Sequence, residues 1–122
     1  MEIITERIAV TTTGTAGAAT GSGVSKAING WIVDVFLDYH ASAPATTDVT
    51  IAYTSRGGNI LVVSNNATDG LYHPRAKAVD NANTAITNAH DYFYISDTVT
   101  VSVAGSDALT GAVVAYIKAV RA

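Results

Sequence analysis

The 122-residue chain fits a single domain that can bury its own core, and its net charge is only -3. Its seven Lys and Arg are scattered rather than gathered in a basic stripe, which argues against nucleic-acid binding. The absence of cysteine excludes a disulfide framework, a thiolate zinc site and a cysteine nucleophile. Only 14% of the residues are charged, so uncharged polar and small side chains must cover much of the surface. Such a surface suits a protein with many neighbours, or a β-protein coated with Thr and Ser.

The N-terminal segment, 1–10, carries two glutamates and no apolar run of signal-peptide length. No stretch reaches the roughly 18 apolar residues of a transmembrane helix. We therefore expect no membrane partner, and synthesis and assembly in a cytoplasm.

The hydrophobic period of the chain is two, which is typical of β-strands. In "TVTVSVA", for example, Val99, Val101 and Val103 alternate with hydroxyl side chains. The predicted strands, in chain order, cover residues 3–12, 31–39, 48–54, 59–65, 91–96, 98–104 and 112–120. Their spacing of about ten residues, with turn signals between them, predicts one all-β domain over residues 1–122. We expect an antiparallel β-sandwich or a small barrel, jelly-roll-like, with little or no helix.

Between the first two strands lies "GTAGAATGSG", Gly14 to Gly23. A phosphate-binding loop needs G-x-x-x-x-G-K-[ST] ahead of a helix, whereas Lys26 here follows Ser25 and precedes a strand. The segment is therefore predicted to be a flexible loop, over about 14–23, that orders against a partner. Its deletion is expected to spare folding.

Three strands raise the question of which face is buried. In "WIVDVFLDY", period two places Trp31 on the face of Val35 and Leu37, as a core aromatic. The strands over 59–65 and 112–120 are apolar on both faces, which indicates central strands or strands at a subunit contact.

Turn signals separate the strands. Ser55–Asn59 reads as a hairpin, Ser96–Asp97 as the two-residue turn of another, and Gly105–Gly111 as the end of a third. Segment 74–90 is rich in Ala, Asn and Thr, and is predicted to be an extended loop with one helical turn or a short strand.

The titratable residues form no convincing reactive group. His40 and Asp38 close one strand and are the best candidates for an acid–base pair, but a solvated strand end accounts for both. Asp34, Asp38 and Asp48 lack the spacing of a calcium loop.

A Ser–His–Asp set can be assembled from Ser64, His73 and Asp69, but no strand–turn–helix nucleophile elbow accompanies it. We therefore predict that the chain is not an enzyme, and that it has no catalytic residue, no cofactor and no metal site.

Aromatic side chains offer a different function. In "DYFYIS", Tyr92 and Tyr94 lie opposite Phe93 and Ile95, so one pair is core and the other can form an exposed or interface patch. A platform for stacking sugars could draw on Trp31, Tyr53, Tyr72, Tyr92 and Tyr94. The candidate interface residues are Tyr92, Tyr94, Val114, Tyr116, Val120, Gly17, Gly21 and Gly23.

Three phrases cover most of the chain from Gly30 onward: "DYHASAPATTDVTIAY", "NILVVSNNATDGLYHPRAKAVDN" and "DTVTVSVAGSDALTGAVVAYIKA". Together they resemble short virion proteins encoded among the head genes of tailed bacteriophages. The resemblance implies a capsid decoration (cement) protein, which binds the outside of an icosahedral shell in many copies, stabilises it and has no active site.

The partners implied are the major capsid protein and the chain itself, as a homotrimer or, failing that, a dimer. The implied location is the capsid surface of the virion, after assembly in the host bacterial cytoplasm. Two alternatives stay open: a phage neck or tail-completion protein, and a carbohydrate-binding β-sandwich module.

Overall fold

The computed structural model describes residues 1–121, which form β-strands joined by turns and loops. The strands are β1 (Glu2–Val10), β2 (Ala19–Val24), β3 (Ile28–Tyr39), β4 (Asp48–Tyr53), β5 (Asn59–Val63), β6 (Gly70–Tyr72), β7 (Ala76–Val79), β8 (Ala85–Asp91), β9 (Tyr94–Asp97), β10 (Val99–Ser106) and β11 (Val113–Arg121). Within this range there is no helix that could cross a membrane.

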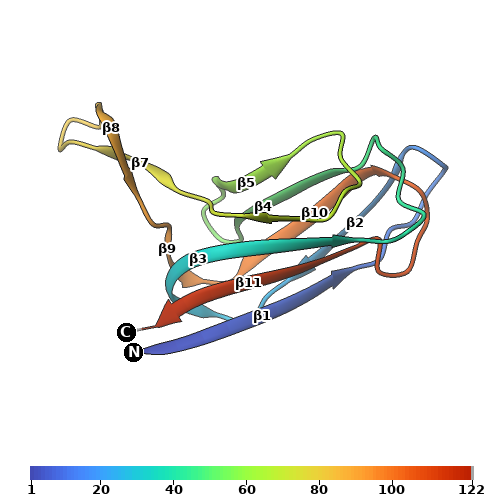
Figure 1. Cartoon of the computed structure of the whole chain (residues 1–122), viewed down its shortest axis with the longest axis horizontal. Coiled ribbons are helices and arrows are strands. Elements are labelled where there is room, and N and C mark those ends of the chain that lie inside the picture. Colours follow the sequence, from blue (N-terminus) through green and yellow to red (C-terminus); the bar gives the residue numbers. More distant parts are fainter. Residues whose placement is uncertain (122) are drawn as a thin grey trace.

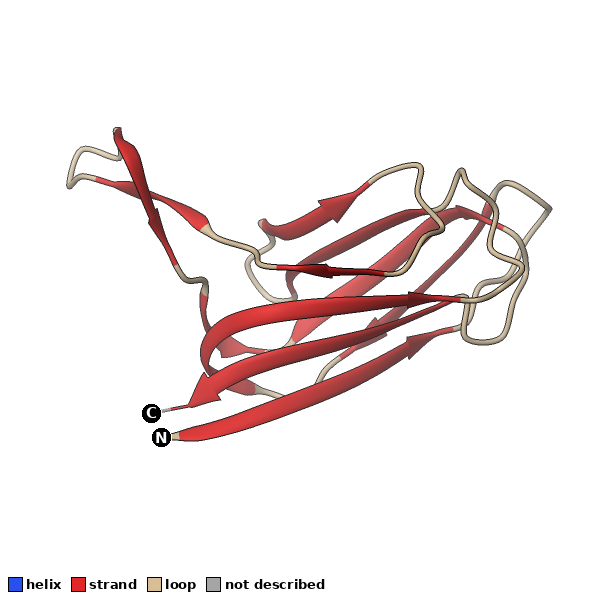
Figure 2. Ribbon diagram, viewed as in Figure 1, coloured by secondary structure: helices blue, strands red, loops and turns tan. Residues whose placement is uncertain are grey.

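Two antiparallel sheets form the body of the molecule (Figures 1 and 2). The four-stranded sheet has the order β2–β10–β4–β5. The five-stranded sheet has the order β1–β11–β3–β6, and β9 also pairs with β3. Because β9 pairs with residues 28–31 of β3 and β6 with residues 35–37, these two short strands act as the halves of one interrupted strand.

The strand pairing is that of a jelly roll. Leaving out β7 and β8, and counting β6 and β9 as one strand, eight strands remain. The first pairs with the eighth (β1–β11), the second with the seventh (β2–β10), the third with the sixth (β3–β6/β9) and the fourth with the fifth (β4–β5). This nested pairing, wrapped into two sheets, confirms the predicted all-β sandwich.

The two sheets share one apolar core. On β10, Val99, Val101 and Val103 are buried, as the alternation predicts. Ile51 of β4 and Ile117 of β11 are fully buried from opposite sheets. Burial of each such side chain stabilises the fold by roughly 1.5–3 kcal/mol, so the inner faces hold the sheets together.

A β-bulge in β3 makes the predicted facing of Trp31 wrong. Two successive residues of β11 pair with Asp34 and Ile32, so Val33 between them has no partner in that ladder. One extra residue moves the alternation by one position. Leu37 therefore points into the core as predicted, whereas Trp31 lies on the outer face with 41% of its surface exposed.

The Gly-rich segment is only partly a loop, because its second half forms β2. A Cβ atom at Gly21 would collide with the carbonyl oxygen of Thr11, and one at Gly23 would lie 2.6 Å from a methyl group of Ile8. These glycines allow β2 to approach the chain of β1 closely, so we now expect that deleting residues 14–23 prevents folding.

The hairpin predicted at Ser55–Asn59 is confirmed and joins β4 to β5. The other two predicted hairpins are wrong. β9 pairs with β3, whereas β10 pairs with β4 and β2, so Thr98 between them crosses from one sheet to the other. Residues 107–112 make a similar crossing from β10 to β11. A turn signal marks a change of direction but does not say whether the two strands it joins are paired.

The two strands that are apolar on both faces have different positions. The strand predicted over 112–120 is β11, which is central between β1 and β3. The strand predicted over 59–65 is β5, which is an edge strand with Val62 exposed, so it is not central.

One hairpin projects away from the body. β7 and β8 pair only with each other, and Figure 1 shows them extending from the end of the molecule where the termini lie. The sequence predicted a loop with one helical turn or a short strand over 74–90, because Asn and Thr there obscure the period of two. We call residues 76–91 the arm.

Candidate functional site

The outer face of the five-stranded sheet carries a row of large apolar side chains. The register pairs Ile3 with Val120, Val120 with Trp31, and Trp31 with Tyr94, so four strands contribute one member each. Side chains directly opposite one another on neighbouring strands are in contact. The ring centroids of Trp31 and Tyr94 are 5.0 Å apart. Ile3 and Tyr94 are 65% and 50% exposed, so this row faces solvent.

A shallow apolar hollow adjoins the row. Its volume is about 320 Å³, and it is lined by Met1, Trp31, Val33, Tyr92 and Val120. Beside it, Arg121 and Glu2 form an ion pair with each other, with Nη1 and Oε1 3.1 Å apart. We call the set Met1, Ile3, Trp31, Tyr92, Tyr94 and Val120 the Trp31 patch.

A second row lies farther along the same outer face. Tyr116 of β11 lies opposite Arg7 of β1 and Phe36 of β3, and Phe36 lies opposite Leu71 of β6. The rings of Phe36 and Tyr116 are 6.3 Å apart, and Leu71 is 54% exposed. We call these four residues the Tyr116 row.

The two rows are separated by an ion pair. Lys118 and Asp34 lie opposite each other, with Nζ and Oδ2 4.0 Å apart. Such a partly exposed pair contributes little to stability. The outer face therefore presents two rows rich in aromatic and aliphatic side chains, and its charged residues are Arg7, Asp34, Asp38 and Lys118. Exposed apolar rows of this kind are typical of a protein–protein contact.

The structure brings together three of the predicted interface residues, Tyr92, Tyr94 and Val120, in the Trp31 patch. Tyr116 and Val114 follow on the same face of β11. The predicted glycines lie elsewhere, and Gly21 and Gly23 are occupied by packing against β1 and the residues that follow it, as described above. Close packing within the chain therefore explains why glycine occupies positions 21 and 23.

The sequence analysis missed six members of this face: Met1, Ile3, Arg7, Trp31, Phe36 and Leu71. Ile3 had a signal, since it is an apolar residue on the face of its strand opposite Ile4, Ile8 and Val10. Trp31 had none, because the bulge at Val33 leaves no mark in the pattern of "WIVDVFLDY".

The foot of the arm is fixed beside the Trp31 patch. Arg75 Nη1 donates a hydrogen bond to the carbonyl oxygen of Val33 at 3.1 Å. The same guanidinium group lies over the ring of Tyr92, 4.1 Å from its centroid. Arg75 precedes β7 and Tyr92 follows β8, so this contact fastens the two legs of the hairpin together and to the β3 bulge.

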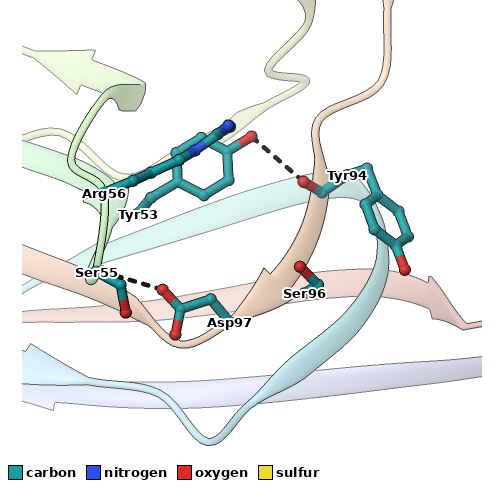
Figure 3. A pocket seen from close by; sticks show the side chains of 6 residues that line it. All are labelled: Tyr53, Ser55, Arg56, Tyr94, Ser96 and Asp97. Carbon is teal, nitrogen blue, oxygen red and sulfur yellow. Dashed lines mark hydrogen bonds between the residues drawn. The ribbon is translucent and has the colours of Figure 1, made fainter.

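A second, polar pocket lies between β4 and β9 (Figure 3). It has a volume of about 440 Å³ and is lined by Tyr53, Ser55, Arg56, Tyr94, Ser96 and Asp97. The guanidinium carbon of Arg56 lies 3.9 Å from the centre of the Tyr53 ring and covers its face. The hydroxyl of Tyr53 donates to the carbonyl oxygen of Tyr94 at 3.3 Å. The pocket can offer hydroxyl, guanidinium and carboxylate groups to a polar ligand.

Asp97 has a structural task in this pocket. Its Oδ1 accepts a hydrogen bond from the backbone N–H of Thr98 at 2.7 Å, and its Oδ2 accepts one from that of Ser55 at 3.0 Å. Hydrogen bonding by the Ser55 side chain, and then by these two backbone groups, holds the pKa of Asp97 below its ordinary value. The carboxylate thus ties the β4–β5 turn to the crossover between the sheets.

The other side chains considered for chemistry each have a partner of their own. The His40 Nδ1 atom accepts a hydrogen bond from the backbone N–H of Ser42 at 3.0 Å, and Asp38 lies opposite Val114 on the outer face. Asp69, from the Ser64–His73–Asp69 set, accepts the backbone N–H of Tyr39 at 2.7 Å.

The three aspartates considered for calcium are dispersed. Asp34 faces Lys118 on the five-stranded sheet, whereas Asp48 accepts the backbone N–H of Asn65 at 2.8 Å on the four-stranded sheet. Among residues 1–121, no three His, Asp or Glu side chains are grouped so that they could hold a metal ion.

Comparison of the sequence with protein-family models and with curated proteins finds no match.

Proposed function

We propose that this chain is a non-enzymatic structural protein of a tailed-phage virion, which binds the outside of an icosahedral capsid in many copies and stabilises the shell. The observation that carries the proposal is the apolar outer face of the five-stranded sheet, built from the Trp31 patch and the Tyr116 row. The resemblance of the sequence to virion proteins gives the surface its proposed partner, the major capsid protein.

The chemistry of this face suits adhesion to another protein. Trp, Tyr and Arg are the side chains that most often carry binding energy at protein interfaces, and all three occur in its two rows. Burial of apolar surface contributes about 25 cal/mol per Å², from which the cost of ordering must be subtracted. A modest gain for each copy is multiplied when many copies brace one shell.

The jelly roll itself does not decide the function, because the same architecture occurs in viral capsid proteins and in lectins. The choice therefore depends on the surface. The outer face offers a broad apolar area, whereas the groups that could act chemically are already engaged: Arg56 on a ring, and Asp97 and His40 on backbone N–H groups.

The first experiment is to count copies in purified particles of the phage that encodes this chain, by quantitative mass spectrometry. A number equal to that of the major capsid protein, or a simple fraction of it, supports decoration. A handful of copies would instead assign the chain to the neck or tail, and complete absence would overturn a role in the virion.

The second experiment measures binding of purified protein to capsids that lack it. Leu71→Asp in the Tyr116 row should weaken binding at least about tenfold, because it places a charge in a desolvated contact. The matched control is Ser102→Asp on the outer face of the four-stranded sheet, which should bind as the unchanged protein does. Equal loss in both variants would contradict docking through the five-stranded sheet.

The polar pocket of Figure 3 supports one second candidate, a carbohydrate-binding module. Stacking of a sugar on Tyr53 would require Arg56 to move, since Arg56 covers that ring. The test is a glycan array with the unchanged protein and with Tyr94→Ala. Glycan binding by the former that is lost in the latter would favour this candidate, and no binding would remove it.

A further inference from the structure

The arm lacks support from its own chain. A two-stranded hairpin is marginally stable in water unless a third strand or a packed face joins it. β7 and β8 pair only with each other, and Val79 and Ile86 are 48% and 49% exposed. An ordered arm of this kind needs a surface to rest on.

The chemistry of the arm identifies what kind of surface that is. From Ala78 to Ala89 its one charged residue is Asp80. That carboxylate already accepts the backbone N–H groups of Ala82 and Thr84 at the tip, at 2.9 and 3.0 Å. The remaining side chains of residues 78–89 are small, aliphatic or uncharged, so this outer part of the arm can be buried against an apolar surface without desolvating a free charge, while Lys77 and Asp91 lie at its foot.

The arm cannot reach its own Trp31 patch. The bonds from Arg75 to Val33 and Tyr92 hold its foot at the edge of that patch and direct it outward (Figure 1). From the foot, the seven residues of β8 extend roughly 23 Å at the rise of a strand. The arm therefore meets a surface on another molecule.

The Trp31 patch of a second copy matches it in size and character. Four adjacent strands span about 14 Å across the patch, and a two-stranded ribbon with its side chains is about 10 Å wide. The patch is apolar, and its neighbouring charges, Arg121 and Glu2, neutralise each other. Both surfaces lie at the same end of the molecule, where Figure 1 shows the termini and the arm.

We propose that the arm of one copy docks on the Trp31 patch of a second copy of this chain. Repeated arm-to-patch contacts form a ring when the rotation between successive copies closes, and two copies can instead exchange arms about a two-fold axis. This inference does not depend on the capsid: it needs only the purified chain, and it leaves the Tyr116 row free for another partner.

The first test compares oligomeric state by light scattering and native mass spectrometry. In the arm-less variant, an Asn-Gly turn replaces residues 77–90 and closes the ladder between Ala76 and Asp91, which already pair. We expect the unchanged protein to be oligomeric, and the arm-less variant to be monomeric and still to unfold cooperatively, at a lower temperature because association no longer stabilises it. A monomeric unchanged protein, or an oligomeric arm-less variant, would overturn the proposal.

Point variants refine this result without removing the arm. Ile86→Asp places a charge on the arm and should weaken association at least about tenfold. Val62→Asp changes an equally exposed aliphatic residue on edge strand β5 and should leave association intact. Retained association of Ile86→Asp, or equal loss in Val62→Asp, would overturn the assignment of the contact to the arm.

A mixing experiment tests the direction of the contact. The arm-less variant keeps the patch, whereas a variant with Ile3→Asp and Trp31→Ser keeps the arm; each alone should be monomeric. Mixed together, they should form a one-to-one heterodimer, because one arm and one patch remain to pair. A patch variant that self-associates, or a mixture that stays monomeric, would contradict an arm-to-patch contact.

The outcome is separable from that of the proposed function. An unchanged protein that binds capsids but is monomeric in solution would reject the arm contact alone. Retained self-association with no capsid binding by the unchanged protein would reject the capsid role alone.

Discussion

The inner faces of the two sheets are both apolar, whereas their outer faces differ in chemical character. Across the four-stranded sheet, the register places Ser22, Ser102, Thr50 and Val62 in one outer row. The comparable row of the five-stranded sheet is Ile3, Val120, Trp31 and Tyr94. Hydroxyl side chains are sufficient for an outer face to fold, so the apolar outer row is not needed for folding. It indicates a surface selected for contact with another molecule.

The largest expected effect tests whether the inner faces are equivalent. Ile117→Ala and Ile51→Ala remove fully buried side chains from opposite sheets, and each should lower the free energy of unfolding by about 2–5 kcal/mol. Denaturant unfolding measures both. If one variant lost less than half as much as the other, the sheets would not share the core equally.

The next effect concerns the edge of the four-stranded sheet. Gly21→Ala forces a methyl group against the backbone of Thr11 and should destabilise the fold by about 1–3 kcal/mol. Gly17→Ala is the matched control: open space surrounds it, and only its φ of 77° opposes the change, at a cost of about 1 kcal/mol. Equal losses would mean that β2 does not need this close approach to the residues that follow β1.

The outer faces should differ in binding while agreeing in stability. Trp31→Ser should change the free energy of unfolding by less than about 1 kcal/mol, because its ring is partly exposed on the sheet surface. Self-association of the same variant should fall at least about tenfold. Ser102→Ala should alter neither quantity. A Trp31→Ser protein that is severely destabilised would make the patch a part of the core.

The dependence of stability on pH should be a smaller effect than those above, and it should occur at both high and low pH. Burial raises the pKa of Tyr39, so the stability it supports is complete below about pH 10 and is lost as the pH rises further. The pKa of Asp97 is lowered from 3.8, so its contribution is present above that pH and is lost on acidification. Thermal unfolding of Asp97→Asn between pH 2 and 7 should show a smaller acid-dependent loss than the unchanged protein. An identical acid profile would contradict the role given to its hydrogen bonds.

The smallest effect is expected at the strand end once considered for acid–base chemistry. His40→Ala and Asp38→Ala should each change stability by less than about 0.5 kcal/mol and leave binding intact. Loss of function with an unchanged fold in either variant would reopen an enzymatic interpretation.

The sequence predicted correctly those features that depend on the local alternation of apolar and polar residues. On β10, Val99, Val101 and Val103 are buried, and on β9 Tyr94 is exposed while Ile95 is buried, because period two assigns faces within an uninterrupted strand. The jelly-roll pairing was predicted only as a class, since no local pattern states that β9 and β10 belong to different sheets.

Other features depend on contacts distant in sequence. Gly21 resembles a loop residue until the chain at Thr11 is brought against it, and the arm is hidden among Asn and Thr that disfavour regular structure. Of the residues on this outer face, the sequence analysis named Tyr92, Tyr94, Val114, Tyr116 and Val120 as interface candidates. Trp31, at the centre of the patch, was assigned to the core because the pattern does not reveal the bulge.

That bulge separates the direction in which a side chain points from its place in the sequence pattern. Val33 is the extra residue, because Asp34 and Ile32 pair with successive residues of β11. A single-codon deletion at Val33 would remove the bulge and leave a regular ladder, in which Ile32 still points into the core and Trp31 still lies on the outer face. In a lineage of such proteins, a gap of one residue at this position could therefore leave the proposed docking surface intact, whereas a strand of the present length that paired without the bulge would turn Trp31 toward the core.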